Sequence, residues 1–80
     1  MRLVVVFKDF DGKIIHPSDV KLTIYDNNQN VLEVITDIEQ NGDNYYYDYI
    51  TTNSDFTFEF SGFYNGKPVL ARQHARVKFY

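Results

Sequence analysis

Two aspartates near the N-terminus stand at a spacing that is found in calcium-binding loops. Asp9 and Asp11 alternate and are followed by Gly12, as at the start of an EF-hand loop. That loop also needs further oxygen ligands and a bidentate Glu at its twelfth position, with a helix on each side. Here residues 13–15, Lys-Ile-Ile, follow in a pattern that is typical of a strand. The sequence therefore predicts a solvated β-turn at this point, and no metal ion or other cofactor.

Hydroxyl, imidazole and carboxylate groups are present, but not at the spacing that identifies a hydrolase. Ser18 or Ser61 could form a triad with His16 or His74 and an aspartate. A catalytic triad is defined by geometry and role, however, so the presence of these residue types does not identify one. The chain has no Gly-x-Ser-x-Gly elbow, no His-Glu-x-x-His pair and no Gly-rich phosphate loop. His16 precedes Pro17 and is expected in a turn, and His74 is expected on the surface of a strand. The sequence predicts a protein that is not an enzyme.

The tyrosines raise the possibility of base stacking, as in proteins that bind single-stranded nucleic acid. Those proteins place aromatic rings along a positively charged groove, whereas this chain has a formal net charge of −3. Tyr45, Tyr47 and Tyr49 also have the alternating spacing of side chains that face a core. We therefore expect no nucleic acid as a partner. Tyr25 and Tyr46 point the other way and are candidates for contact with another protein, because exposed Tyr is enriched in such interfaces.

The uneven distribution of charge gives the clearest indication of an interaction. All eleven Asp and Glu residues lie within residues 1–60, whereas residues 61–80 contain no acid and half of the eight Lys and Arg residues. Near the C-terminus, basic side chains recur at every second position, which would place them on one face of a strand. We call this set the basic ladder; it consists of Arg72, His74, Arg76 and Lys78.

The basic ladder has two interpretations. Together with Tyr80 and Tyr46 it forms the predicted interaction face, which would bind an acidic protein partner. Alternatively, its residues pair across strands with Glu59 or Asp48 of the same sheet, where each pair contributes about 0.2–1 kcal/mol. The sequence leaves both open.

These residues must be positioned by β-strands, because apolar and polar residues alternate almost throughout and turn residues recur every eight to twelve positions. No segment has a helical period. We expect an all-β fold, an immunoglobulin-like antiparallel β-sandwich of about seven short strands. The expected strands cover residues 2–8, 20–25, 31–38, 45–49, 56–60 and 68–80. The expected core contains Leu22, Ile24, Tyr47, Phe58, Phe60 and Val77.

The 80 residues are enough for one domain, which we expect to span residues 1–80. The chain has no cysteine and no Cys/His cluster for zinc, so seven Tyr and seven Phe must supply the core. The apolar run at residues 3–7 is too short for a signal peptide, and no run approaches the ~20 apolar residues of a membrane-spanning helix. We expect a soluble protein that is made in the cytoplasm and has no membrane partner.

The order of these motifs resembles the small immunoglobulin-like domains in structural proteins of tailed bacteriophages. The resemblance covers most of the chain. It consists of Asp-Val-Lys-Leu-Thr-Ile-Tyr-Asp at residues 19–26, the alternating tyrosines after Gly42, and the aromatic strand at residues 56–62. The chain departs from that pattern by placing Asp43 and Asn44 between Gly42 and the tyrosines, which indicates a longer turn. The resemblance implies a structural protein of the virion that contacts capsid or tail proteins or copies of itself.

A second resemblance is to carboxypeptidase-regulatory-like modules, in which an Asp-x-x-Gly-x-x-Ile turn leads into a Val-x-Leu strand. Asp9, Gly12, Ile15, Val20 and Leu22 follow this order here. That family is also sandwich-like and non-catalytic. Both resemblances imply a binding or structural module, located in the virion if a phage encodes it and otherwise in the cytoplasm. A ligand-binding module, for instance one for carbohydrate, is the alternative.

Overall fold

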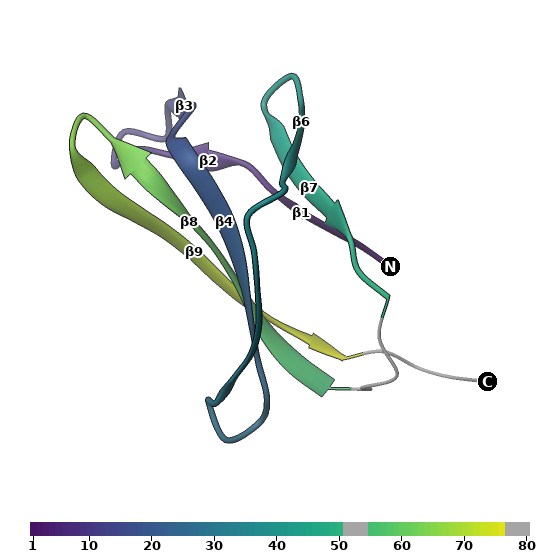
Figure 1. Cartoon of the computed structure of the whole chain (residues 1–80). Helices are drawn as coiled ribbons and strands as arrows, with labels where there is room; N and C mark the ends of the chain where they lie inside the picture. The colour runs from purple at the N-terminus through teal and green to yellow at the C-terminus, as the bar shows by residue number, and fades with distance from the viewer. Residues whose placement is uncertain (51–54, 77–80) are drawn as a thin grey trace.

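The computed structural model describes residues 1–50 and 55–76, and residues 73–76 by their backbone alone. These residues form nine β-strands and contain no helix, so none of them could cross a membrane as a helix (Figure 1). The strands are β1 (Arg2–Val5), β2 (Phe7–Lys8), β3 (Ile14–Ile15), β4 (Ser18–Tyr25), β5 (Val31–Ile35), β6 (Glu39–Asn41), β7 (Asn44–Asp48), β8 (Asp55–Tyr64) and β9 (Lys67–Arg76).

The strands form two layers. One layer is a four-stranded sheet in the order β5-β4-β8-β9, the other is the three-stranded sheet β1-β7-β6, and β2 and β3 form a separate two-stranded sheet. Every pairing is antiparallel. In Figure 1 the long strands β4, β8 and β9 lie side by side, and β1 and β7 lie across from them. The fold is therefore all-β with antiparallel sheets, as the alternating pattern predicts.

The core lies between the layers because alternate residues of each strand point to the same side. Its largest fully buried side chains are Phe56, Phe60, Leu22 and Ile24. Aromatic rings join the two layers at one end, where Tyr49 packs edge-to-face on Phe56 with 5.4 Å between ring centroids. The other buried members of the core are Leu3, Val5, Phe7, Ile15, Ile35, Tyr45 and Phe58.

The predicted core is largely confirmed. Leu22, Ile24, Phe58 and Phe60 are buried, and Tyr47 is half-buried against the same cluster. Val77 lies outside the described residues.

The expected number of about seven strands is wrong, because nine are found in the described residues. The segment expected as a single strand at residues 2–8 divides at Val6, where β1 pairs with β7 and β2 pairs with β3 in a different sheet. The expected strand at residues 31–38 ends at Ile35, and β6 follows in the other layer. A segment can change its partner sheet without any change in its alternation, so the pattern alone misses these breaks.

The turns form where the sequence predicts them. The Asp9 carboxylate accepts hydrogen bonds from the backbone N–H groups of Asp11 and Lys13, both at 2.9 Å, so it closes the β2–β3 turn. At the β8–β9 turn, Asn65 and Gly66 have φ values of 53° and 76°. Two consecutive positive φ values are typical of the type I′ hairpin turn, in which Asn-Gly is favoured.

A bulge in β4 brings β8 unusually close. The register between these strands shifts between Ser18 and Lys21, and Asp19 has a positive φ of 53°. Opposite the bulge stands Gly62, where an added Cβ would lie 2.9 Å from both Pro17 Cβ and the Ser18 carbonyl oxygen. Glycine therefore permits the close approach. Asp19 and Val20 of the bulge line a groove in the surface of the sheet.

Candidate functional site

The outer face of the four-stranded sheet carries a groove of about 520 Å³. The register aligns the outward residues of three strands in rows across this face. Lys21, Ser61 and Leu70 form one row, and Thr23, Glu59 and Arg72 form the next. The groove lies over the first row beside the β4 bulge, and the residues that line it include Lys21, Glu59, Ser61, Phe63, Pro68 and Leu70.

The groove combines an apolar surface with a few polar groups. Phe63 is 50% exposed and Leu70 is 65% exposed. Both stand at outward positions of the sheet, where polar residues are usual. Ser61 is only 8% exposed, and its hydroxyl oxygen has no hydrogen-bond partner within residues 1–50 and 55–72. Buried polar groups almost always have a partner, so the Ser61 hydroxyl is an exception among the described residues.

Arg72 of the basic ladder borders the groove and is held in place on three sides. Its guanidinium forms an ion pair with Glu59 at 2.8 Å and lies 4.9 Å from the centre of the Tyr25 ring. It also donates to the Gln29 side-chain oxygen at 3.4 Å. The hydrogen bond to Glu59 is the main cause that raises the pKa of Arg72. Cross-strand pairing with Glu59 is therefore present at this position, as the alternative interpretation predicts.

The rest of the basic ladder is described only in part. The register of β9 places His74 opposite Thr57 and Arg76 opposite Asp55, at the same two-residue spacing as Arg72 opposite Glu59. The side chains of His74 and Arg76 are outside the description, as are Lys78 and Tyr80 entirely. The role of the basic ladder beyond Arg72 thus stays a prediction.

Tyr46 does not join Arg72, because it belongs to β7 in the other layer. The Arg2 guanidinium lies 4.3 Å from the centre of the Tyr46 ring and pairs with Asp48 at 2.8 Å. The hydrogen bond from Arg2 is the main cause that lowers the pKa of Asp48. Asp48 thus pairs with Arg2, whereas Arg72 pairs with Glu59. The predicted interaction face is divided between two sheets, because Tyr46 lies in one and Arg72 in the other. Alternation shows that Tyr46 and Arg72 both point outward, but not that they point outward from different layers.

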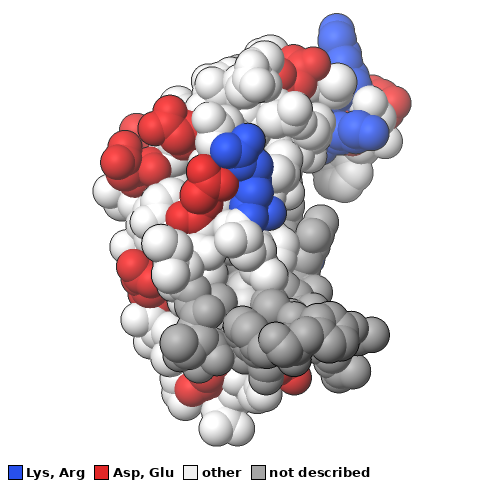
Figure 2. All heavy atoms as spheres, turned by 90° about the vertical axis from the view of Figure 1, so that its right-hand side faces the viewer, with Lys and Arg blue, Asp and Glu red and all other residues white. Residues whose placement is uncertain are grey.

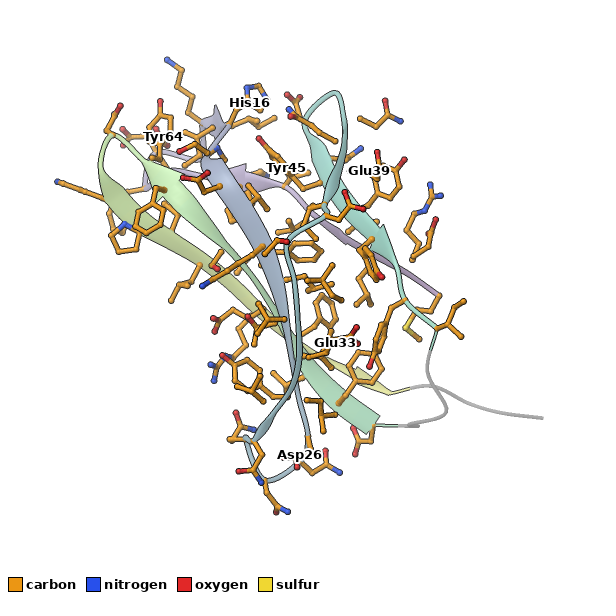
Figure 3. The ribbon with its side chains drawn as sticks, in the orientation of Figure 1. His16, Asp26, Glu33, Glu39, Tyr45 and Tyr64 are labelled. Carbon is orange, nitrogen blue, oxygen red and sulfur yellow. The ribbon has the colours of Figure 1, made fainter. Side chains whose placement is uncertain are left out.

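Of the groups considered for hydrolysis, His16 meets an aspartate, but no hydrogen bond joins it to Ser18 or Ser61 within the described residues. His16 Nε2 lies 2.8 Å from Asp43 Oδ1, and both side chains are about half exposed (Figure 3 labels His16). The Ser18 hydroxyl donates to the Phe63 carbonyl at 3.2 Å, so it is engaged with the backbone of β8. Residues 1–50 and 55–72 also contain no group of three or more His, Cys, Asp or Glu placed to hold a metal ion.

The groove was not predicted from the sequence. The sequence does indicate it through Phe63, Pro68 and Leu70. These residues are apolar, yet they lie on the opposite side of the strands from Phe60 and Ala71, which face the core. Recognising that signal requires the register of β8 against β9 and the bulge in β4, and both are properties of the folded sheet.

Comparison of the chain with protein-family models, with curated proteins and with solved structures gives no match.

Proposed function

We propose that this protein is a non-catalytic assembly module that binds other proteins through the outer face of its four-stranded sheet. The observation that carries the proposal is the groove, in which Phe63 and Leu70 expose apolar surface beside the fixed pair of Arg72 and Glu59. Exposed apolar patches next to ordered polar groups are typical of interaction sites.

The composition of this face supports a protein partner. Tyr and Arg are enriched in protein interfaces and often supply most of the binding energy. Here Tyr25 and Arg72 are already stacked on one another, so little side-chain freedom would be lost when a partner binds. The ion pair with Glu59 further restricts the guanidinium.

The assembly that we propose is a phage or prophage virion, in which this protein is an accessory of the capsid or tail. The resemblance of residues 19–26, 45–49 and 56–62 to immunoglobulin-like domains of phage structural proteins supports this part of the proposal. An immunoglobulin-like topology for the two layers belongs to the same proposal, as does a location in the virion.

The test is to delete the gene in a strain that produces particles and to complement it with wild type, Phe63→Glu or Phe10→Glu. Phe10 is fully exposed in the β2–β3 turn, so its replacement adds the same charge away from the groove. We expect wild type and Phe10→Glu to co-purify with particles and Phe63→Glu to be lost from them. Absence of the wild-type protein from purified particles would contradict the assembly function.

Carbohydrate binding is the second candidate, and the Ser61 hydroxyl is the observation that favours it. This unpartnered hydroxyl shares the groove with Lys21, Glu59 and the Phe63 ring, a combination of polar groups around an apolar surface that suits a sugar. A glycan array probed with wild type and Ser61→Ala would separate the two candidates. Binding of a glycan that Ser61→Ala abolishes would favour the sugar, and no binding to any glycan would favour the protein partner.

A further inference from the structure

The four-stranded sheet has two edges that are open within the described residues. In the order β5-β4-β8-β9, β5 pairs only with β4 and β9 pairs only with β8. Among the nine strands of residues 1–50 and 55–76, none lies beside the outer backbone N–H and C=O groups of β5 and β9. Such groups are a template for the strand of another chain unless the edge is protected.

The β5 edge lacks the usual protection. Val31, Leu32 and Val34 are 57%, 47% and 52% exposed, and β5 contains neither Lys nor Pro. Its only charged residue is Glu33. By contrast, β6 in the other layer consists of Glu, Gln and Asn, and β9 contains Pro68 and basic residues. Of the two open edges of the four-stranded sheet, β5 is thus the one that contains neither Pro nor a basic residue.

The surroundings of β5 are acidic. Residues 22–66 contain no Lys or Arg, and Asp37 and Glu39 follow β5 directly along the chain. Figure 3 shows Asp26, Glu33 and Glu39 in succession along the segment that runs from the β4–β5 turn to β6. Figure 2 shows acidic side chains down the left margin of the molecule, whereas the basic side chains visible on this face lie in its middle and at its upper right, each beside an acidic one. A strand that pairs with β5 should therefore be basic.

The β9 strand meets that requirement. It carries Lys67, Arg72 and Arg76 and contains no acid. Lys67 and Leu70 are exposed, so this edge also presents both charge and apolar surface. The two open edges of one sheet thus have opposite charge and similar apolar character.

The direction of the strands agrees with this match. β5 is antiparallel to β4, β4 to β8 and β8 to β9, so β5 and β9 run in opposite directions. When two copies stand side by side in the same orientation, β9 of one copy is antiparallel to β5 of the next. The alternating order of the sheet would then continue from copy to copy without a break.

We propose that the protein assembles with itself head to tail, with β9 of each copy added to β5 of the next. Pairing of β5 with β5 would bring two acidic edges together, and pairing of β9 with β9 would bring two basic edges together, so charge disfavours both. A head-to-tail contact repeats and forms a ring or a filament. This inference rests on the proposed assembly function and names the second copy as one of its partners.

The test uses two variants, each with one blocked edge. Leu32→Lys/Val34→Lys places two cations on the β5 edge, and Lys67→Glu/Leu70→Glu places two anions on the β9 edge. All four side chains are exposed, so both variants should fold, which circular dichroism checks. The matched control for Leu32→Lys/Val34→Lys is Phe10→Lys/Ile14→Lys, which adds two lysines at exposed apolar positions around the β2–β3 turn.

Sedimentation velocity over a wide range of concentrations gives the readout. We expect wild type and the control to form oligomers beyond the dimer at low salt, with a loss of association at high salt. Each blocked variant alone should be monomeric, and an equimolar mixture of the two should associate again, because the first variant keeps its β9 edge and the second keeps its β5 edge. Monomeric wild type at every concentration would overturn the inference, as would dimers of Lys67→Glu/Leu70→Glu alone, which indicate pairing of β5 with β5.

Failure of this inference is distinguishable from failure of the proposed function. Phe63→Glu changes the groove and neither open edge, so it should leave self-association unchanged. Loss of particle binding in Phe63→Glu with intact self-association would separate the two surfaces. Loss of self-association in Phe63→Glu would overturn the edge-to-edge arrangement.

Discussion

Replacing Gly62 by Ala should destabilise the protein through two contacts at the β4 bulge. The new Cβ would lie 2.9 Å from Pro17 Cβ and 2.9 Å from the Ser18 carbonyl oxygen. Crowding of this kind in a packed region costs about 1–3 kcal/mol. The loss of glycine's freedom in the unfolded chain opposes it by about 0.4–1 kcal/mol, because Gly62 does not have a positive φ. The expected net loss is about 1–2 kcal/mol in the free energy of unfolding.

Urea denaturation followed by circular dichroism measures this change as a lower midpoint with an unchanged m-value. In a thermal scan the same loss should lower Tm by about 4–8 °C per kcal/mol for a domain of this size. Pro17→Ala should not rescue Gly62→Ala, because alanine keeps the Cβ that makes the contact, whereas Pro17→Gly removes it. An unfolding free energy for Gly62→Ala at or above that of wild type would show that β4 and β8 do not approach in this way.

Four further outcomes are expected. Ser61→Ala should raise the free energy of unfolding by about 1 kcal/mol, because it removes a buried hydroxyl without a partner. A lower free energy of unfolding in urea denaturation would contradict this. Asp26 has a lowered pKa, chiefly because its carboxylate accepts the Asn30 N–H, so its stabilising effect should be lost as pH falls below about 4. Asp26→Asn should therefore reduce the loss of stability at low pH. Burial, and then Asp43, raises the pKa of Tyr45, so stability should fall as pH rises beyond about 10, and Tyr45→Phe should remove that dependence. EDTA should leave the unfolding midpoint unchanged, and a downward shift would indicate a bound metal ion.

Much of the fold could be predicted from local patterns. The alternation around Leu22 and Ile24 and around Phe58 and Phe60 identifies the inward face of β4 and of β8 correctly. The turn at Asn65 and Gly66 is predictable because few residue pairs accept two positive φ values. These features depend on residues that are close in the chain, so the sequence is sufficient to predict them.

The candidate site was predicted less completely. Arg72 was identified as an outward basic residue, and the structure adds its contacts with Glu59, Tyr25 and Gln29. Tyr46 was grouped with it and lies in the other layer. The groove was not predicted, because it depends on the register of strands that are distant in the sequence.

By itself, the sequence determined the all-β class, the inward and outward faces of the main strands, and the separation of acids from bases along the chain. It determined these because alternation and turn propensity act over a few residues. Only the tertiary structure decided where β1 ends and β2 begins, which layer holds Tyr46, and how the bulge opposite Gly62 opens a groove. It also decided that the apolar β5 and the basic β9 form the two edges of one sheet. The reason is that pairing joins residues far apart in the chain, and many pairings are compatible with the same alternation.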